Sequence, residues 1–278
     1  MIKKYEGYID IVSTLHHAGN EKTGSSPILR ATHIYSEEFG FVRLPYLNGN
    51  AIRGNMRRKL MYDFCLLIGC APESINTKIY HMLFTGGALE AGESTYASID
   101  LHLRREIRKL LTPISLYGCS LSNQMIPGKL KVGMAYPVCK EYSGLLPVQL
   151  KADTRADKYV REFTDMSFST RRDDLRADRA ENEQAVQMKV DYECFIPGTR
   201  LSHWFALEHP SDVETSCFGR LIELFSKSPY LGGKSNSGNG EVTFTYTPDI
   251  PDSTLYLKYV DDNKEDIKTM LDTIEGMI

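Results

Sequence analysis

Alternation of apolar and polar side chains marks several strand-like stretches along the chain. In the first of them, Ile9 and Ile11 alternate with Tyr8 and Asp10, which is the period of a strand with one buried face. Comparable stretches lie at 5–17, 28–47, 129–141, 187–210 and 241–247. A Pro-Gly pair at 197–198 predicts a turn that divides the fourth stretch into two strands.

Apolar residues with helical spacing lie between these strands. Asn48 or Asn50 can cap a helix that begins near Ala51. The apolar stripe of this helix consists of Ile52, Met56, Leu60, Phe64 and Leu67. A second amphipathic helix is predicted over 212–229, and an acidic helix over 264–277 closes the chain.

Two stretches interrupt the pattern. Residues 72–128 are mainly helical in character and predict an inserted lobe. Residues 150–187 hold few large apolar side chains, and 151–181 contain eight basic and eight acidic residues. Such a segment buries little surface, so we expect an arm. The remaining order is strand, helix, strand, strand, helix, strand, which predicts a single α+β domain over 1–278 with a ferredoxin-like core.

Composition narrows the class of protein. The 278 residues can bury a sizeable core, and the six cysteines are scattered without a C-x-x-C pair. The chain opens without a secretory signal, and its apolar runs fall short of the ~20 residues of a membrane helix. We therefore expect a reduced, cytoplasmic protein with no metal, no cofactor and no membrane partner.

The net charge of −3 conceals an uneven distribution. The acidic C-terminal segment 249–278 sums to −5, so residues 1–248 sum to +2. Residues 43–59 hold five basic side chains and no acidic one. A local positive stretch suits an anionic partner such as nucleic acid, and a solvated helix face is the alternative.

The positive stretch includes the helix entry over 45–60, where an Asn-Gly-Asn turn precedes Arg53, Arg57 and Arg58. Backbone N–H groups at a helix start favour anions, and arginines add charge and bidentate geometry. This segment therefore predicts a site for a phosphate group or a phosphate backbone. A capped helix with exposed arginines is the alternative.

A glycine-rich loop over 232–240 is the second candidate. It lacks the spacing of a phosphate-binding P-loop and the third glycine of a dinucleotide fingerprint. Its backbone can still approach a ligand closely, beside Lys234, Ser235, Asn236 and Ser237. A flexible turn leading into a hairpin is the alternative.

His16 and His17 form the third candidate, followed by Lys22 and Thr23. Histidines after a strand can transfer protons on RNA or stack on bases. Adjacent histidines point in opposite directions on a strand, so they make a poor metal pair.

In the arm, Arg171, Arg172 and Arg176 can contact phosphates, and Phe168 or Met166 can insert between bases. A solvated loop is the alternative.

Three segments, taken in this order, resemble the RAMP superfamily of CRISPR systems and, within it, the backbone subunit, the seventh Cas protein family. They are the helix entry at 45–57, the Ile-Pro-Gly-Thr turn at 196–199 and the glycine-rich loop at 232–240. The type IV variant is the most similar, through the His16-His17 pair with 20–24, the Arg-Arg-Asp-Asp run at 171–174 and the Gln187-Met188 pair.

The resemblance implies an RNA-recognition-like palm with a finger at 72–128 and a thumb at 150–187. It implies copies that stack head to tail along a guide (cr)RNA, each thumb displacing one base, so that the other bases pair with target nucleic acid. Other CRISPR effector subunits are further implied partners. The expected RNA-binding residues are His16, His17, Lys22, Thr23, Asn48, Asn50, Arg53, Arg57, Arg58, Arg171, Arg172, Arg176, Gln187, Met188, Lys234, Ser235, Asn236 and Ser237.

One departure from the family pattern concerns catalysis. Type III backbone subunits cut target RNA with an aspartate in the loop before the helix entry, whereas the loop 32–43 here holds Glu37 and Glu38 and no aspartate. We therefore predict a non-catalytic subunit. The alternatives are a metal-independent ribonuclease that processes guide RNA through His16 or His17, a type III-like subunit that cleaves target RNA, and a small-ligand or protein-interaction module. For the acidic segment 249–278, we expect either contact with a neighbouring copy or a solvated cover.

Overall fold

The computed structural model describes residues 1–87, 101–121, 124–172 and 187–277. The strands are β1 (Ile2–Ile11), β2 (Ala18–Thr23), β3 (Ser26–Leu29), β4 (Ala31–Ser36), β5 (Gly40–Pro45), β6 (Gly118–Leu121), β7 (Gln124–Pro127), β8 (Leu130–Val132), β9 (Tyr136–Pro137), β10 (Thr164–Arg172), β11 (Gln187–Phe195), β12 (Arg200–Glu208) and β13 (Val242–Thr247). The α-helices are α1 (Gly49–Leu67), α2 (Thr77–Phe84), α3 (Leu101–Leu110), α4 (Thr112–Tyr117), α5 (Asp212–Lys227), α6 (Thr254–Asp262) and α7 (Lys264–Glu275). Within the described ranges, none of these helices combines the length and the apolar character that a membrane span requires.

A central antiparallel sheet organises the molecule. Its strand order is β13-β1-β12-β8, and β9 also pairs with β12. Ile9 lies opposite Leu201 on one side and opposite Phe244 on the other. Helix α1 follows β1 in the chain, and α5 lies between β12 and β13. The chain is thus a mixed helix-and-sheet protein with antiparallel sheets, which agrees with the predicted class at this level.

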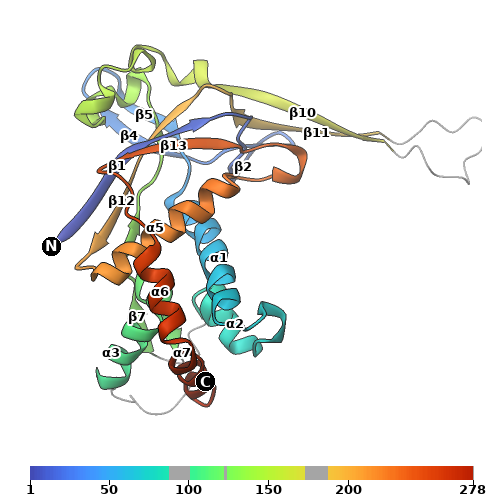
Figure 1. Cartoon of the computed structure of the whole chain (residues 1–278). Helices are drawn as coiled ribbons and strands as arrows, with labels where there is room; N and C mark the ends of the chain where they lie inside the picture. Colours follow the sequence, from blue (N-terminus) through green and yellow to red (C-terminus); the bar gives the residue numbers. More distant parts are fainter. Residues whose placement is uncertain (88–100, 122–123, 173–186, 278) are drawn as a thin grey trace, which may run out of the picture.

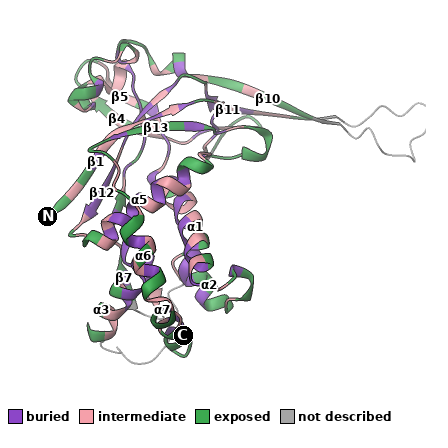
Figure 2. Ribbon diagram, in the orientation of Figure 1, coloured by how far each residue is buried: buried purple, intermediate pink, exposed green. Residues whose placement is uncertain are grey.

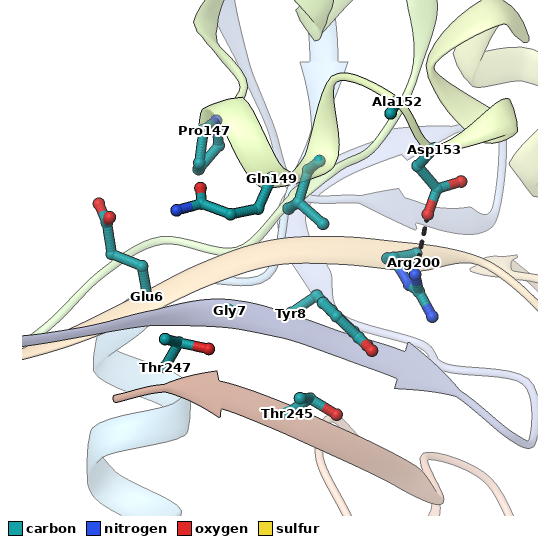
Figure 3. Close-up of a pocket in the computed structure, with 11 residues that line it drawn as sticks. Glu6, Gly7, Tyr8, Pro147, Gln149, Ala152, Asp153, Arg200, Thr245 and Thr247 are labelled. Carbon is teal, nitrogen blue, oxygen red and sulfur yellow. Dashed lines mark hydrogen bonds and ion pairs between the residues drawn. The ribbon is translucent and has the colours of Figure 1, made fainter. Parts of the chain in front are cut away.

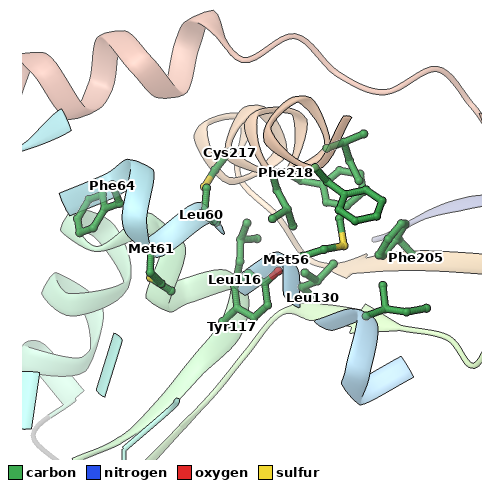
Figure 4. Close-up of a cluster of buried hydrophobic side chains, with 14 of the residues drawn as sticks. Met56, Leu60, Met61, Phe64, Leu116, Tyr117, Leu130, Phe205, Cys217 and Phe218 are labelled. Carbon is green, nitrogen blue, oxygen red and sulfur yellow. The ribbon is translucent and has the colours of Figure 1, made fainter. Parts of the chain in front are cut away.

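The main core lies between one face of this sheet and the helices α1 and α5. Met56 and Leu60 of α1, Phe205 of β12 and Phe218 of α5 are all buried there (Figure 4). Figure 2 shows the buried residues along the inward faces of both helices. Burying each large apolar side chain contributes about 1.5–3 kcal/mol, so the predicted stripe of α1 is what attaches this helix to the sheet.

The opposite face of the sheet is partly covered by the segment 138–163, which forms short 3-10 turns. Leu146, Leu150 and Ala156 are buried in a small cluster against Tyr8. A cavity of about 410 Å³ remains between this segment and β1, β12 and β13 (Figure 3). Arg200 closes its end with two 2.7 Å bonds to Asp10 and one of 2.9 Å to Asp153. Residues 150–163 therefore belong to the body.

Within the segment 150–187, the two-stranded ribbon of the arm begins at Thr164. Strands β10 and β11 pair from Thr164 opposite Phe195 to Arg172 opposite Gln187, and Figure 1 shows this two-stranded ribbon extending away from the body. Arg176 lies outside the described residues. The same holds for the side chains of Arg171, Arg172, Gln187 and Met188, of which only the backbone is described.

The inserted lobe contains α2, α3, α4 and the hairpin β6–β7, which the sequence pattern did not predict. The acidic C-terminal segment packs against this lobe of its own chain. Tyr256, Val260, Ile267, Leu271 and Ile274 are buried. The Asn76 side chain donates to Glu275 at 2.9 Å, and the Tyr259 hydroxyl donates to the carbonyl of Lys109 at 2.9 Å. The apolar side of this segment is thus buried within the molecule.

Candidate nucleic-acid interface

His16 connects β1 to two other parts of the molecule. Its backbone pairs with Gly233, whose N–H donates to the His16 carbonyl at 2.9 Å. Its Nδ1 lies 2.6 Å from the carbonyl oxygen of Glu193 in β11, so Nδ1 is the donor. With 8% of its surface exposed, His16 is held by the glycine-rich loop and the root of the arm.

His17 makes the corresponding connection to the helix entry. Its Nε2 accepts the Asn48 backbone N–H at 3.3 Å, and Asn48 itself caps α1, as predicted, by accepting the N–H of Asn50 at 2.8 Å. Burial, followed by the charges of Arg30 and His16, lowers the pKa of His17 to about 4. His17 is therefore a neutral acceptor near pH 7. The histidine pair joins the start of α1 to the glycine-rich loop.

The glycine-rich loop is a hydrogen-bonded turn. Gly232 and Gly240 have positive φ angles of 76° and 84°, and a Cβ at either would overlap the backbone oxygen of His16 or Leu231. Between them, a 3-10 turn over Ser235–Ser237 leaves the side chains of Ser235, Asn236 and Ser237 exposed. The two glycines let the loop lie tightly against the rest of the molecule while its tip faces solvent.

Tyr192 of β11 is a residue that no sequence motif indicated. It is 4% exposed, and the Lys234 ammonium lies 3.4 Å from the centre of its ring. Its ring also packs edge-on against His16, with centroids 4.7 Å apart. A single tyrosine in a strand carries no motif, and only its place in the alternating pattern of 187–195 indicated that it would be buried.

Arg53 and Arg57, the two arginines expected to hold a phosphate chain, are directed toward the inserted lobe and bond backbone carbonyls there. Arg57 is 4% exposed and donates to the carbonyls of Met82 at 2.7 Å and Leu83 at 2.5 Å, in the last turn of α2. Arg53 donates to the carbonyl of Tyr117, the last residue of α4. Because helix C-termini carry partial negative charge and unpaired carbonyls, both arginines act as caps that attach the lobe to α1.

The electrostatics agree with this structural role. Both guanidinium groups lie over the Tyr117 ring, 5.0 Å from its centre for Arg53 and 5.5 Å for Arg57. Burial and the neighbouring Arg53 lower the pKa of Arg57 to about 10, so it still carries its charge near pH 7. Neither arginine has a carboxylate partner in the described part of the chain. Helix dipoles and the ring face stabilise these charges instead.

The polar residues of the helix entry therefore lie on two different sides of α1. Asn55, about 200° from Arg53 around the helix, donates to the Tyr230 carbonyl at 3.2 Å, just before the glycine-rich loop. Arg58 is exposed, as is Asn50 in the first turn. The structure thus brings the asparagine-containing turn to the glycine-rich loop, but it directs Arg53 and Arg57 toward the lobe.

Lys22 and Thr23 lie at the exposed end of β2. Its partner strand β3 is tied to the root of the arm, because the Ser26 hydroxyl donates to Asp191 at 2.6 Å and the Leu29 N–H donates to Glu193 at 2.8 Å. The surface that emerges comprises the glycine-rich loop, the arm root and the β2–β3 hairpin, with the histidine pair beneath. We call it the loop–arm surface.

Among the described residues, no cluster of histidine, cysteine, aspartate or glutamate side chains has the arrangement of a metal site.

Comparison with known proteins shows a similarity of fold to solved structures. Neither a protein-family model nor a curated protein sequence matches the chain. Among solved structures, the fold is similar to that of a chain in a structure titled "Type IV-B CRISPR Complex", with a TM-score of 0.63 and 20% sequence identity. The match covers 91% of this chain and 96% of the other.

Proposed function

We propose that this chain is a non-catalytic backbone subunit of a CRISPR ribonucleoprotein effector complex, which binds guide RNA on its loop–arm surface. The observation that carries the proposal is the fold likeness over 91% of the chain to a chain of a type IV-B CRISPR complex. The sequence motifs that resemble the seventh Cas protein family support the same class of subunit.

The palm of this subunit is a ferredoxin-like, RNA-recognition-like fold. Its support is the sheet order β13-β1-β12-β8. We number β1, β8, β12 and β13 as palm strands one to four, in chain order. Across the sheet they then follow the antiparallel order four-one-three-two of a ferredoxin-like fold. Helix α1 lies between the first and second palm strands in the chain, and α5 lies between the third and fourth. The inserted lobe is then the finger, and the β10–β11 ribbon is the thumb.

The loop–arm surface suits a ribose-phosphate chain. Lys234 offers an ammonium group, and the exposed polar side chains of Ser235, Asn236 and Ser237 can bond phosphates and 2′-hydroxyl groups. On the arm, Phe168 is 76% exposed and Met166 is 36% exposed. An exposed aromatic ring on a projecting ribbon is suited to stack on or separate bases.

The chemistry of the histidine pair favours binding over cleavage. The His16 ring is engaged by Glu193, and the lowered pKa of His17 makes it a weak base that already accepts a backbone N–H. In the hairpin β4–β5, which replaces the aspartate loop of type III subunits, Glu38 forms an ion pair with Lys140 at 3.1 Å. Each of these groups therefore already has a partner within the chain. We further propose that copies stack head to tail on the guide in the cytoplasm, with other effector subunits and the target nucleic acid as partners.

The test is equilibrium binding of a fluorescent single-stranded RNA over a range of salt concentrations. The wild-type chain is expected to bind with strong salt dependence, and Lys234→Asn is expected to reduce the slope of log affinity against log salt by about 0.7, the value for one phosphate contact on a single strand. Asparagine tolerates the left-handed backbone of Lys234 (φ 63°), so the variant removes charge without strain.

Lys268→Asn on the distant helix α7 is the matched control, and its slope is expected to equal that of the wild type. Absence of RNA binding, or equal slopes for Lys234→Asn and the wild type, would contradict the proposed surface. Incubation of the same RNA with the protein, with and without EDTA, tests the absence of cleavage, and cutting that disappears in His17→Ala would support the ribonuclease alternative.

A further inference from the structure

Tyr192 receives contacts from segments that are far apart in the sequence. Its hydroxyl accepts a bond from the Asn239 side chain of the glycine-rich loop at 3.0 Å and another from the Ser167 hydroxyl of β10 at 3.2 Å. The Lys234 ammonium lies over its ring, and His16 packs against the ring edge. One buried side chain thus touches the loop, the arm and the histidine pair.

Backbone and side-chain hydrogen bonds hold the loop around Lys234 in place. Lys234 has a left-handed backbone, which costs a non-glycine residue about 1–2 kcal/mol. The carbonyl of Lys234 accepts the N–H of Ser237 at 2.9 Å, and Asn239 also accepts the Thr14 hydroxyl at 2.7 Å. On the side of the arm, Lys234 and Asn239 of the loop both contact Tyr192.

The arm is held at the corresponding point. Ser167 directly precedes Phe168, the exposed aromatic residue of the arm. In the partner strand, Asp191 lies opposite Phe168 and Tyr192 lies opposite Ser167. The hydroxyl of Ser167, the residue next to Phe168 in the chain, thus contacts the Tyr192 hydroxyl across the ribbon.

We propose that Tyr192 is a positioning residue that couples the glycine-rich loop to the arm, so that Lys234 and Phe168 engage one single-stranded RNA as a unit. This inference rests on the proposed function. Tyr192 is covered by its neighbours and contacts no RNA itself. It fixes the distance between a cation that neutralises a phosphate and a ring that stacks on a base further along the strand.

The test is a double-mutant cycle in RNA affinity, which isolates the coupling between two residues. Lys234→Asn and Phe168→Ala are measured singly and together, first with Tyr192 and then in the Tyr192→Phe background. Phenylalanine retains the ring under Lys234 and against His16 but loses both hydroxyl bonds. When Tyr192 is present, the fold-loss of RNA affinity in the Lys234→Asn, Phe168→Ala double variant is expected to differ at least threefold from the product of the two single fold-losses. In the Tyr192→Phe background, the difference is expected to shrink to within error.

A structural role alone would not move this quantity, because a general loss of stability lowers all four affinities together. Tyr259→Phe, which removes a hydroxyl bond on the far side of the lobe, is the control and should leave the coupling unchanged. Coupling that persists in the Tyr192→Phe background, or that is absent with Tyr192, would overturn the inference while leaving the proposed function intact. Absence of RNA binding by the wild type would overturn both. If Tyr192→Phe does not fold, Ser167→Ala removes the arm side of the connection alone and must give the same loss of coupling.

Discussion

At the scale of single residues, two histidines show how burial controls charge. His203 is 1% exposed; its Nε2 donates to the Gly133 carbonyl at 3.1 Å, and its Nδ1 accepts the Tyr246 hydroxyl at 2.7 Å. Burial lowers the pKa of His203 to about 3, as it lowers that of His17 to about 4, from 6.5. Both residues are therefore neutral in the folded protein over the whole range in which a free histidine titrates.

This difference predicts a pH-dependent stability. The unfolded chain binds protons at these histidines below pH 6.5 while the folded chain does not, so the free energy of unfolding is highest above pH 6.5 and falls as the pH drops toward 4. For buried His203 the slope approaches about 1.4 kcal/mol per pH unit, and the more exposed His17 contributes less. Urea unfolding between pH 7.5 and 4.8 measures it. His203→Gln should flatten the profile, and a profile parallel to that of the wild type would contradict this account.

Arg57 and Arg58 are neighbours with opposite expected roles. Arg57→Met leaves two buried carbonyls of α2 without a donor, so we expect the free energy of unfolding to fall by about 2–4 kcal/mol. Arg58→Met removes only an exposed side chain and is expected to change it by less than about 0.5 kcal/mol. Chemical denaturation of both variants checks this. Equal stabilities would restore Arg57 as a candidate for direct RNA contact.

The sequence predicted some of these residues well and others poorly, for a physical reason. The Asn48 cap follows from local rules that depend only on neighbouring residues. The placement of Arg53 and Arg57 depends on what covers that flank of α1, and the covering helices α2 and α4 come from an insertion whose position no local pattern specifies. Tyr192 was missed because its partners lie in segments distant in the sequence.

At the scale of elements, the alternation of apolar residues predicted most strands of the central sheet, and the apolar stripe over 52–67 predicted helix α1. Strands β1, β11, β12 and β13 and helices α1 and α5 lie where the pattern predicted. The stretch 129–141 instead forms two short strands, β8 and β9, because both pair with separate parts of β12. The 3-10 turns of 138–163 escaped prediction because their charged residues surround only a few apolar side chains.

The arm gives a prediction that separates binding from stability. Because Phe168 is 76% exposed, Phe168→Ala is expected to change the free energy of unfolding by less than about 0.5 kcal/mol. The same change should weaken binding of single-stranded RNA roughly 5- to 150-fold, since stacking of one base contributes about 1–3 kcal/mol. Thermal unfolding and fluorescence binding measure the two effects. Unchanged RNA affinity would show that the ring does not stack on bases.

At the scale of the whole molecule, charge and packing divide the protein into two ends. The loop–arm surface carries Lys234 and Lys22 beside the projecting ribbon, whereas α6 and α7 place acidic side chains over the inserted lobe. Figure 1 shows the arm and the C-terminal helices on different sides of the body. The proposed RNA surface and the acidic helices are therefore separate parts of the molecule.

Ultraviolet cross-linking of the purified protein to single-stranded RNA, followed by mass spectrometry of the cross-linked peptides, tests the central claim most directly. The account predicts cross-links within 164–172, 187–195 and 232–240, and none at Arg53 or Arg57. Cross-links concentrated on α6 and α7, or on the lobe around Arg57 with none in the glycine-rich loop, would contradict it.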